Sequence, residues 1–243
     1  MTTVWQRVFR SALAVAAALA AVVVVFRVLG LLGPRYLAPL LPLGFIVMAV
    51  VPFVFLTRAG RVSIGMVRPA RVQSYAIAAV VGTFAATVCF VAGFALYGTT
   101  PDNWFVTIAG YYRQQMDTGG LSLPQLYLVF TAPALVLSPI GEELFFRGLL
   151  QTTLQQRFSY RASTSVEAGL FALVHLCHHG LAVTTAGLVL RPVSAAIWVL
   201  LMFLTAVAFA WLRRSTGSVL PAIAAHMGFN AAMNALIFGA LWH

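Results

Sequence analysis

Long apolar runs separated by short polar stretches cover almost the whole chain. A helix needs about 20 apolar residues to cross a hydrocarbon core of about 30 Å. By that measure the pattern predicts seven candidate spans, with approximate bounds 8–32, 37–56, 74–98, 124–150, 162–182, 193–212 and 217–242. Prolines inside the second and fourth runs predict kinks there. We therefore expect an all-α fold, a polytopic bundle of transmembrane helices with about seven spans and a range of six to eight.

The arginines lie mostly between these runs, and their distribution predicts the orientation of the chain. An N-terminus on the cytoplasmic side places ten of them on inner segments, namely Arg7, Arg10, Arg58, Arg61, Arg68, Arg71, Arg157, Arg161, Arg213 and Arg214. The same orientation places Arg35, Arg113 and Arg191 on outer loops, while Arg27 and Arg147 fall inside predicted spans. Because cytoplasmic loops carry the excess of basic residues, we expect the N-terminus inside and, with seven spans, the C-terminus outside.

Composition narrows the class of protein further. The chain of 243 residues is 61% hydrophobic and 8% charged, whereas a soluble domain is about 45–50% apolar and about 25% charged. This balance excludes a soluble globular enzyme, a disordered chain and a disulfide scaffold. We expect residues 1–243 to form a single membrane domain, because no repeat or linker divides them. Arginine replaces lysine throughout and alanine is abundant, which is typical of GC-rich prokaryotes and predicts a bacterial cytoplasmic membrane.

The net charge of +10 raises the possibility of a nucleic-acid partner. The arginines flank apolar spans, however, and no basic domain with interleaved aromatic residues is present. This arrangement predicts contacts with anionic membrane lipids and no nucleic-acid binding.

Strongly polar side chains within the predicted spans gather in three short segments. The segments are PIGEELFFRGLL, FALVHL and AAHMGFNAAMN, and their polar residues are Glu142, Glu143, Arg147, His175, His226 and Asn230. Because an ionisable group at bilayer depth costs at least a few kcal/mol, such residues indicate a functional site.

Helical spacing separates the roles of the two adjacent glutamates. Glu143 and Arg147 are four residues apart, so they share a helix face and can form an ion pair. Glu142 is rotated from its neighbour by about 100°, which leaves its carboxylate available as a base. A purely structural ion pair between helices explains Glu143 and Arg147 equally well, but it explains Glu142 less well.

His226 and Asn230 repeat the four-residue spacing, so both side chains project into one space. An intramembrane histidine that only bridges helices is the alternative interpretation. Two further histidines, His178 and His179, are expected to be a solvated pair at the outer interface. Glu167 is expected to pair with Arg161 or Arg157 at the inner end of its span.

The segments EELFFRG, FALVH and HMGFN resemble the three motifs of the CAAX protease and bacteriocin-processing (CPBP, or Abi) family of intramembrane endopeptidases, which includes the type II CAAX prenyl endopeptidases. The family pattern is two glutamates followed by an arginine, a phenylalanine four residues before a histidine, and a histidine four residues before an asparagine. The resemblance covers roughly residues 125–238 as a catalytic core within the single membrane domain. It implies hydrolysis of a peptide bond inside the membrane, near the cytoplasmic side.

Family roles transfer to the matching positions of this sequence. Glu142 matches the general base that activates a water, and His175 matches the histidine that shares in activating or positioning that water. His226 and Asn230 match the pair that stabilises the developing oxyanion.

The remaining matched positions have supporting roles. Glu143 and Arg147 match the supporting pair, and Phe171 is the packing residue of the second motif. We expect no cofactor and a metal-free glutamate mechanism, because no HExxH motif is present and asparagine is a poor zinc ligand. A zinc-dependent version of the same protease, with Glu142, His175 and His226 as ligands, stays open.

The resemblance also implies the substrate class, a membrane-associated protein or peptide. Its members act on prenylated proteins, process bacteriocins or confer immunity to them, and occur in C-terminal sorting systems. Two alternatives from other classes are a non-catalytic immunity or scaffold protein and, less favoured, a transporter. A transporter would line a continuous path with polar groups, whereas these groups are expected to cluster.

Overall fold

A computed structural model describes residues 1–3, 5, 11–115, 120–184 and 187–242. Within them, six helical segments are long and apolar enough to cross a membrane. These segments are α2 (Ala12–Leu32), the stretch Arg35–Phe55 that contains α3 (Leu40–Phe55), α5 (Gln73–Tyr97), the continuous stretch Leu123–Leu154, α10 (Pro192–Thr216) and α11 (Leu220–Ala240). The protein is thus an integral, multi-pass membrane protein with an all-α fold, as the apolar pattern predicts.

Shorter elements connect the spans. They are the 3₁₀-helix η1 (Arg35–Leu37), α4 (Arg58–Ser63), α6 (Trp104–Gln115), α9 (Tyr160–Val174) and the 3₁₀-helix η3 (His175–Cys177). The stretch Leu123–Leu154 is itself composite: α7 (Leu123–Glu142) passes into a π-helix, η2 (Glu143–Leu150), and then into α8 (Gln151–Leu154). Bulky apolar side chains on the outer faces are exposed, as expected where lipid covers them.

The prediction of a continuous fifth span over 162–182 is wrong. The helix α9 has 15 residues and ends at Val174, which is too short for the hydrocarbon core at 1.5 Å per residue. After η3, β1 (Leu181–Thr184) and β2 (Gly187–Leu190) pair as an antiparallel hairpin. Gly180 has φ +106°, a conformation that ends helical geometry at no steric cost to glycine. The apolar residues that resemble the end of a span therefore belong to a hairpin.

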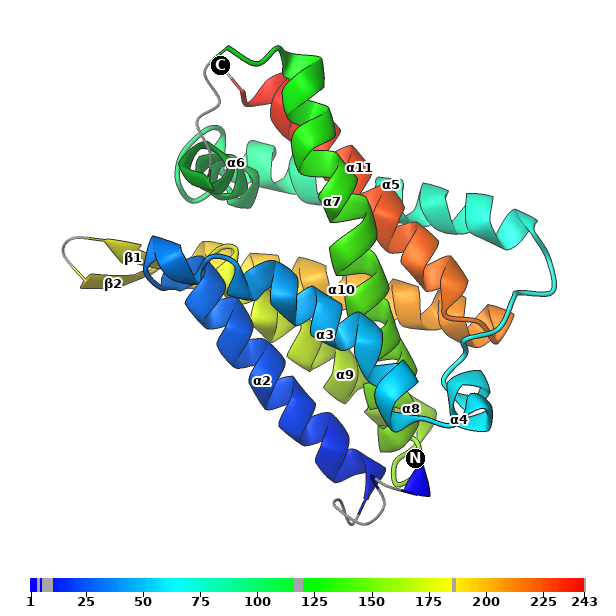
Figure 1. Cartoon of the computed structure of the whole chain (residues 1–243). Coiled ribbons are helices and arrows are strands. Elements are labelled where there is room, and N and C mark those ends of the chain that lie inside the picture. Colours follow the sequence, from blue (N-terminus) through cyan, green and yellow to red (C-terminus); the bar gives the residue numbers. More distant parts are fainter. Residues whose placement is uncertain (4, 6–10, 116–119, 185–186, 243) are drawn as a thin grey trace.

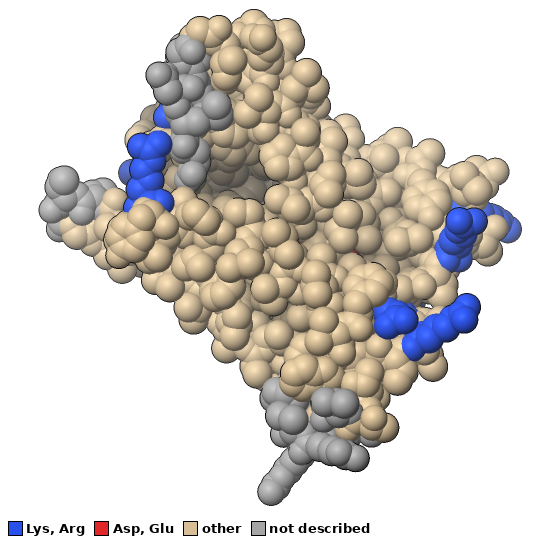
Figure 2. All heavy atoms as spheres, viewed as in Figure 1, with Lys and Arg blue, Asp and Glu red and all other residues tan. Residues whose placement is uncertain are grey.

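Figure 1 shows how the ends of the elements group. The α8–α9 link, the α10–α11 link and α4 lie on one side of the molecule, and η1, α6 and the hairpin lie on the opposite side. Figure 2 shows the arginines of the viewed face at two opposite margins, with a broad band of uncharged residues between them. This distribution fits a membrane band across the middle. The assignment of the α4 side to the cytoplasm stays a prediction.

Two cores hold the bundle together. One joins α5, α6, α10 and α11 around Trp104 and Trp198, and the other joins α2, α3, η2 and α9 around Phe145 and Phe171. Trp104 and Trp198 stack with ring centroids 5.7 Å apart. The second core brings the N-terminal helices against the end of α7, which positions the polar residues described below.

The crossing of α5 and α11 depends on small residues. A Cβ at Gly228 would lie 2.5 Å from the Ala79 carbonyl oxygen, and one at Gly82 would lie 1.7 Å from the Ala225 carbonyl oxygen. Backbones approach this closely only where side chains are absent. The glycine of the HMGFN segment therefore brings α11 against α5 and fixes the height of His226.

Gly82→Ala is expected to destabilise the protein by about 1–3 kcal/mol, because the added methyl group forces α5 and α11 apart. The change should appear as a lower melting temperature in detergent, measured by intrinsic tryptophan fluorescence. Gly169→Ala on α9 is the control, since nothing lies within 4 Å of a Cβ at that position. Equal melting of the two variants would show that the close crossing does not limit stability.

Candidate active site

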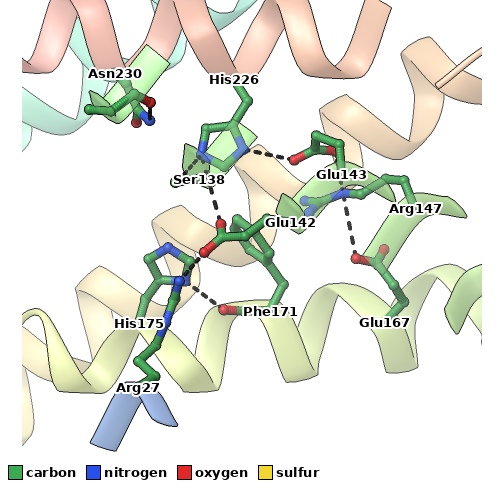
Figure 3. Close-up of polar contacts among 11 residues, drawn as sticks. Arg27, Ser138, Glu142, Glu143, Arg147, Glu167, Phe171, His175, His226 and Asn230 are labelled. Carbon is green, nitrogen blue, oxygen red and sulfur yellow. Dashed lines mark hydrogen bonds and ion pairs between the residues drawn. The ribbon is translucent and has the colours of Figure 1, made fainter. Parts of the chain in front are cut away.

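Four polar residues of the three segments, Glu142, His175, His226 and Asn230, line a cavity of about 540 Å³. Residues from α2, α3, α6, α7, α9, η3, α10 and α11 line it, and most of the lining is apolar. Figure 2 shows the viewed face hollowed between α6 and the start of α3. Figure 3 shows Glu142, His175, His226 and Asn230 converging on one region from different elements. The predicted site residues are therefore brought together in space.

Glu142 is the last residue of α7, and its carboxylate lies at the cavity. Arg27 of α2 forms an ion pair with Oε1 of Glu142, and both side chains are at most 3% exposed. The second oxygen, Oε2, has no hydrogen-bond partner within the described part of the chain. Nε2 of His226 lies 3.8 Å from Oε2. One oxygen of this carboxylate is thus engaged and the other faces the site.

Glu143 points in a different direction and is held from two sides. His226 donates from Nδ1 to Oε1 of Glu143 at 2.8 Å, and Nε of Arg147 lies 3.2 Å from Oε2. Glu143 and Arg147 are fully buried. The predicted ion pair is confirmed, and so is the divergence of the two glutamates.

The local backbone contributes to this divergence. Glu142 ends the α-helix, and Glu143 begins the π-helix, in which hydrogen bonds reach five residues back instead of four. Such widened turns are frequent at functional sites. Two prolines inside α7, Pro133 and Pro139, remove backbone donors just before this transition.

Arg147 also contacts the carboxylate of Glu167, for which the sequence predicts a different arginine partner. Its Nε lies 3.5 Å from Oε1 of Glu167, and its guanidinium lies over the Phe171 ring, 4.0 Å from the centroid. The expected pairing of Glu167 with Arg157 or Arg161 is wrong. Glu167 lies on the buried face of α9, whereas both of those arginines are exposed.

His175 is oriented by the carbonyl one helical turn before it. Nδ1 donates to the Phe171 carbonyl oxygen at 2.6 Å, and Trp198 donates from Nε1 to the His175 carbonyl oxygen at 3.1 Å. A neutral ring with its proton on Nδ1 carries a lone pair on Nε2. Figure 3 shows this second nitrogen pointing away from Phe171. His175 therefore presents a proton acceptor beside Glu142.

Asn230 lies one turn beyond His226 on α11 and faces α7. Its Nδ2 donates to the Ala134 carbonyl oxygen at 2.8 Å, which engages one of the two amide hydrogens. Ser138 Oγ lies 3.5 Å from His226 Nε2. The shared face predicted for His226 and Asn230 is thus directed at the cavity.

The expectation of a solvated His178–His179 pair is wrong. His179 is fully buried and bridges two hydroxyl groups, with Nδ1 3.0 Å from Thr107 Oγ1 and Nε2 2.9 Å from Ser194 Oγ. Burial lowers the pKa of His179 to about 4, which favours the neutral ring. His178 stacks on His175 and lines the cavity. Thr107 on α6 and Ser194 on α10 thus enclose the His179 ring, whereas His178 is half-buried at the cavity.

Arg27 is a charged residue at the cavity that the motifs do not include. An arginine inside an apolar run needs a buried acid to balance it, and the chain has only five acidic residues. Three of these, Glu142, Glu143 and Glu167, lie in predicted spans, so charge balance limits the partner of Arg27 to these three glutamates. The choice between Glu142 and Glu143 depends on the geometry of the π-helix.

The side chains at the site can be compared with those that a zinc ion needs as ligands. Among the described residues, no three His, Cys, Asp or Glu side chains form a group that could hold a metal ion. Glu142, one of the three candidate ligands, already carries the guanidinium of Arg27. A fixed cation at that carboxylate repels a second, divalent cation.

Comparison with known protein families covers the same region. Residues 124–232 match the family described as type II CAAX prenyl endopeptidase Rce1-like. This segment is similar to the Rce1-like family. It contains all three polar motifs, from Glu142 to Asn230, and the similarity supports a CAAX-type peptidase. No curated protein and no solved structure matches the chain. The helices α2, α3 and α5, including Arg27, lie outside the Rce1-like segment.

Proposed function

We propose that this chain is an intramembrane endopeptidase that hydrolyses a peptide bond of a membrane-associated protein or peptide by means of a water activated by Glu142. The observation that carries the proposal is Oε2 of Glu142, which has no hydrogen-bond partner among the described residues and lies at the cavity beside His175 and His226. A carboxylate oxygen without a hydrogen-bond donor, at the wall of a largely apolar cavity, is a suitable proton acceptor.

The proposed reaction needs no group beyond these side chains and one water. Oε2 of Glu142 takes a proton from the water, whose oxygen attacks the carbonyl carbon of the scissile bond. Nε2 of His175 accepts a hydrogen bond from the same water and orients it. When the C–N bond breaks, Glu142 returns the proton to the leaving amine. The products are a carboxylic acid and a free amine.

Donors for the developing oxyanion come from α11. The second N–H of Asn230 is available to the cavity, because the first is engaged by Ala134. The Nδ1–H of His226 is directed to Glu143, so its Nε2 becomes a donor to the oxyanion when the ring takes up a second proton. Donors aimed at the charge that forms in the transition state lower the barrier most. Glu143 and Arg147 support the reaction by fixing the His226 ring.

The cavity favours a substrate with an apolar group next to the scissile bond. Its wall includes Pro39, Pro42, Phe45, Phe130 and Phe229. A prenyl group or an apolar peptide segment fits such a lining, and a C-terminal sorting signal is the alternative source of an apolar segment. We place the protein in a bacterial cytoplasmic membrane, with the α4 side facing the cytoplasm and anionic lipids.

The site also favours an enzyme over the two alternative classes. A transporter would connect polar groups into a path through the membrane, whereas the polar groups here surround one cavity with apolar walls. A scaffold or immunity protein has no need for a buried carboxylate oxygen without a hydrogen-bond donor, which lowers stability.

A direct assay tests the proposal. The purified full chain is reconstituted in liposomes and given a peptide with a C-terminal CAAX sequence, with and without a prenyl group, and an unrelated transmembrane peptide. We expect one internal cleavage, located by mass spectrometry of both products, and faster turnover of the prenylated peptide. An absence of internal cleavage in all three peptides would overturn the proposal. Equal cleavage of both CAAX peptides would keep the protease and remove the preference for the lipid.

Chelation distinguishes the two versions of the protease. We expect 1,10-phenanthroline to change the cleavage rate by less than about twofold, because the mechanism draws on carboxylate and imidazole groups instead of a metal-bound water. The non-chelating 1,7-isomer is the control for effects on the liposomes. Loss of cleavage with the 1,10-isomer alone, restored by added zinc, would establish the zinc-dependent version.

A further inference from the structure

We propose that Arg27 is a positioning residue for the reaction, holding Oε1 of Glu142 so that Oε2 is presented to the substrate water. This inference rests on the proposed function and assigns a role to a residue outside the Rce1-like segment. It extends the active site to α2, the first helix that the structure describes in full.

Arg27 is buried and has few partners. It is 3% exposed, and its guanidinium lies 5.4 Å from the centroid of the Phe45 ring on α3. Among the described residues, Glu142 is the carboxylate with which it pairs. A guanidinium in apolar surroundings is costly unless a carboxylate balances it. The pair therefore ties the rotamer of each side chain to that of the other.

The consequence for Glu142 is an asymmetry between its two oxygens. A free carboxylate at the end of a glutamate side chain rotates, because its terminal torsion is broad. Arg27 removes this freedom by engaging Oε1 from the α2 side. The other oxygen then points toward His226 Nε2, 3.8 Å away. The base is thus held in position before the substrate binds. A catalytic group that is positioned in advance raises the reaction rate, because less freedom is lost in reaching the transition state.

The two adjacent glutamates, Glu142 and Glu143, therefore pair with different arginines. Arg147, from the same helical stretch, serves Glu143, while Arg27, from an N-terminal helix, serves Glu142. The Glu143 pair adjoins His226 and Glu167, and it supports the oxyanion side of the site. The Glu142 pair adjoins the cavity and supports the base. Loss of Arg27 should therefore affect turnover more than substrate binding.

The test compares steady-state kinetics of Arg27→Gln and Arg27→Lys in liposomes. We expect kcat of Arg27→Gln to fall at least about tenfold with KM within about threefold, the pattern of an interaction that acts in the transition state. Arg27→Lys keeps a positive charge and should retain a kcat at least about three times that of Arg27→Gln, because an ammonium engages one oxygen without the planar fork. Arg191→Gln is the matched control, since Arg191 also pairs with one carboxylate, Asp102, but near the surface.

Unfolding is separated from positioning by melting temperature. Rates are measured at least 10 °C below the melting transition of each variant, so a fold defect alone leaves kcat unchanged. If Arg27→Gln does not fold, Arg27→Lys carries the test, with a reduced kcat and an unchanged KM as the supporting result. A kcat of folded Arg27→Gln near the wild-type value overturns the inference, and if only Arg27→Lys folds, a wild-type kcat of that variant overturns it. So does a raised KM with kcat unchanged, which would make Arg27 a substrate-binding residue. Cleavage by Glu142→Gln at the wild-type rate would instead contradict the proposed function itself.

Discussion

Glu142→Gln is expected to reduce peptide cleavage at least about 10³-fold, because the amide cannot accept a proton from water and general base catalysis contributes about 10²–10⁴. The measurement is the rate of product formation by the full chain in liposomes, with the wild type beside it. Glutamine is close in size to glutamate, so the cavity keeps its shape. The substitution also leaves the Arg27 guanidinium without a counter-charge, which should lower the melting temperature.

The loss of activity and the loss of stability can be separated. The double variant Arg27→Gln/Glu142→Gln removes both charges, and its melting temperature should recover toward the wild-type value. Its activity should stay as low as that of Glu142→Gln. A doubly substituted protein that is stable and active would show that Glu142 is not the base.

Arg147→Met is expected to cause the largest loss of stability of any single substitution at the site. The change leaves two fully buried carboxylates, Glu143 and Glu167, without their shared cation. Breaking a buried pair by removing one partner costs about 3–5 kcal/mol. The expected result is a large fall in the melting temperature, accompanied by reduced cleavage because His226 loses its fixed partner.

Two comparisons test that explanation. Adding Glu167→Gln to Arg147→Met removes one of the stranded charges and should restore part of the lost stability. Arg191→Met breaks a pair near the surface and should cost at most about 1 kcal/mol. Similar melting temperatures for Arg147→Met and Arg191→Met would mean that the buried network does not stabilise the bundle.

Much of this architecture follows from the apolar pattern, because bilayer thickness sets the length of a spanning helix. The bounds of α5, 73–97, differ by one residue at each end from the apolar run, 74–98. The pattern fails where apolar residues serve another element. In the apolar run that contains His175, the backbone groups form their hydrogen bonds first in α9 and then in the hairpin. Hydropathy alone does not distinguish a pair of short strands from a helix.

The sequence predicts some of the contacts at the candidate site but not others. Spacing along one helix locates Glu143 beside Arg147, because helical neighbours are fixed by local geometry. Contacts between distant segments are not fixed in this way. The partners Arg27 for Glu142 and Arg147 for Glu167 depend on how α2 and α9 pack, and on the π-helix that turns the adjacent glutamates apart.

The distance along the chain between Arg27 and Glu142 has a consequence for biosynthesis. The two residues are 115 positions apart, and ribosomes add about 5–20 residues per second. Arg27 thus leaves the ribosome about 6–23 seconds before its counter-charge. During that interval the nascent α2 should keep its guanidinium near water or lipid headgroups, as long basic side chains do when they reach toward the interface. The pairing of α2 with α7 therefore follows the synthesis of Glu142, so the candidate site forms only after both helices are in the membrane.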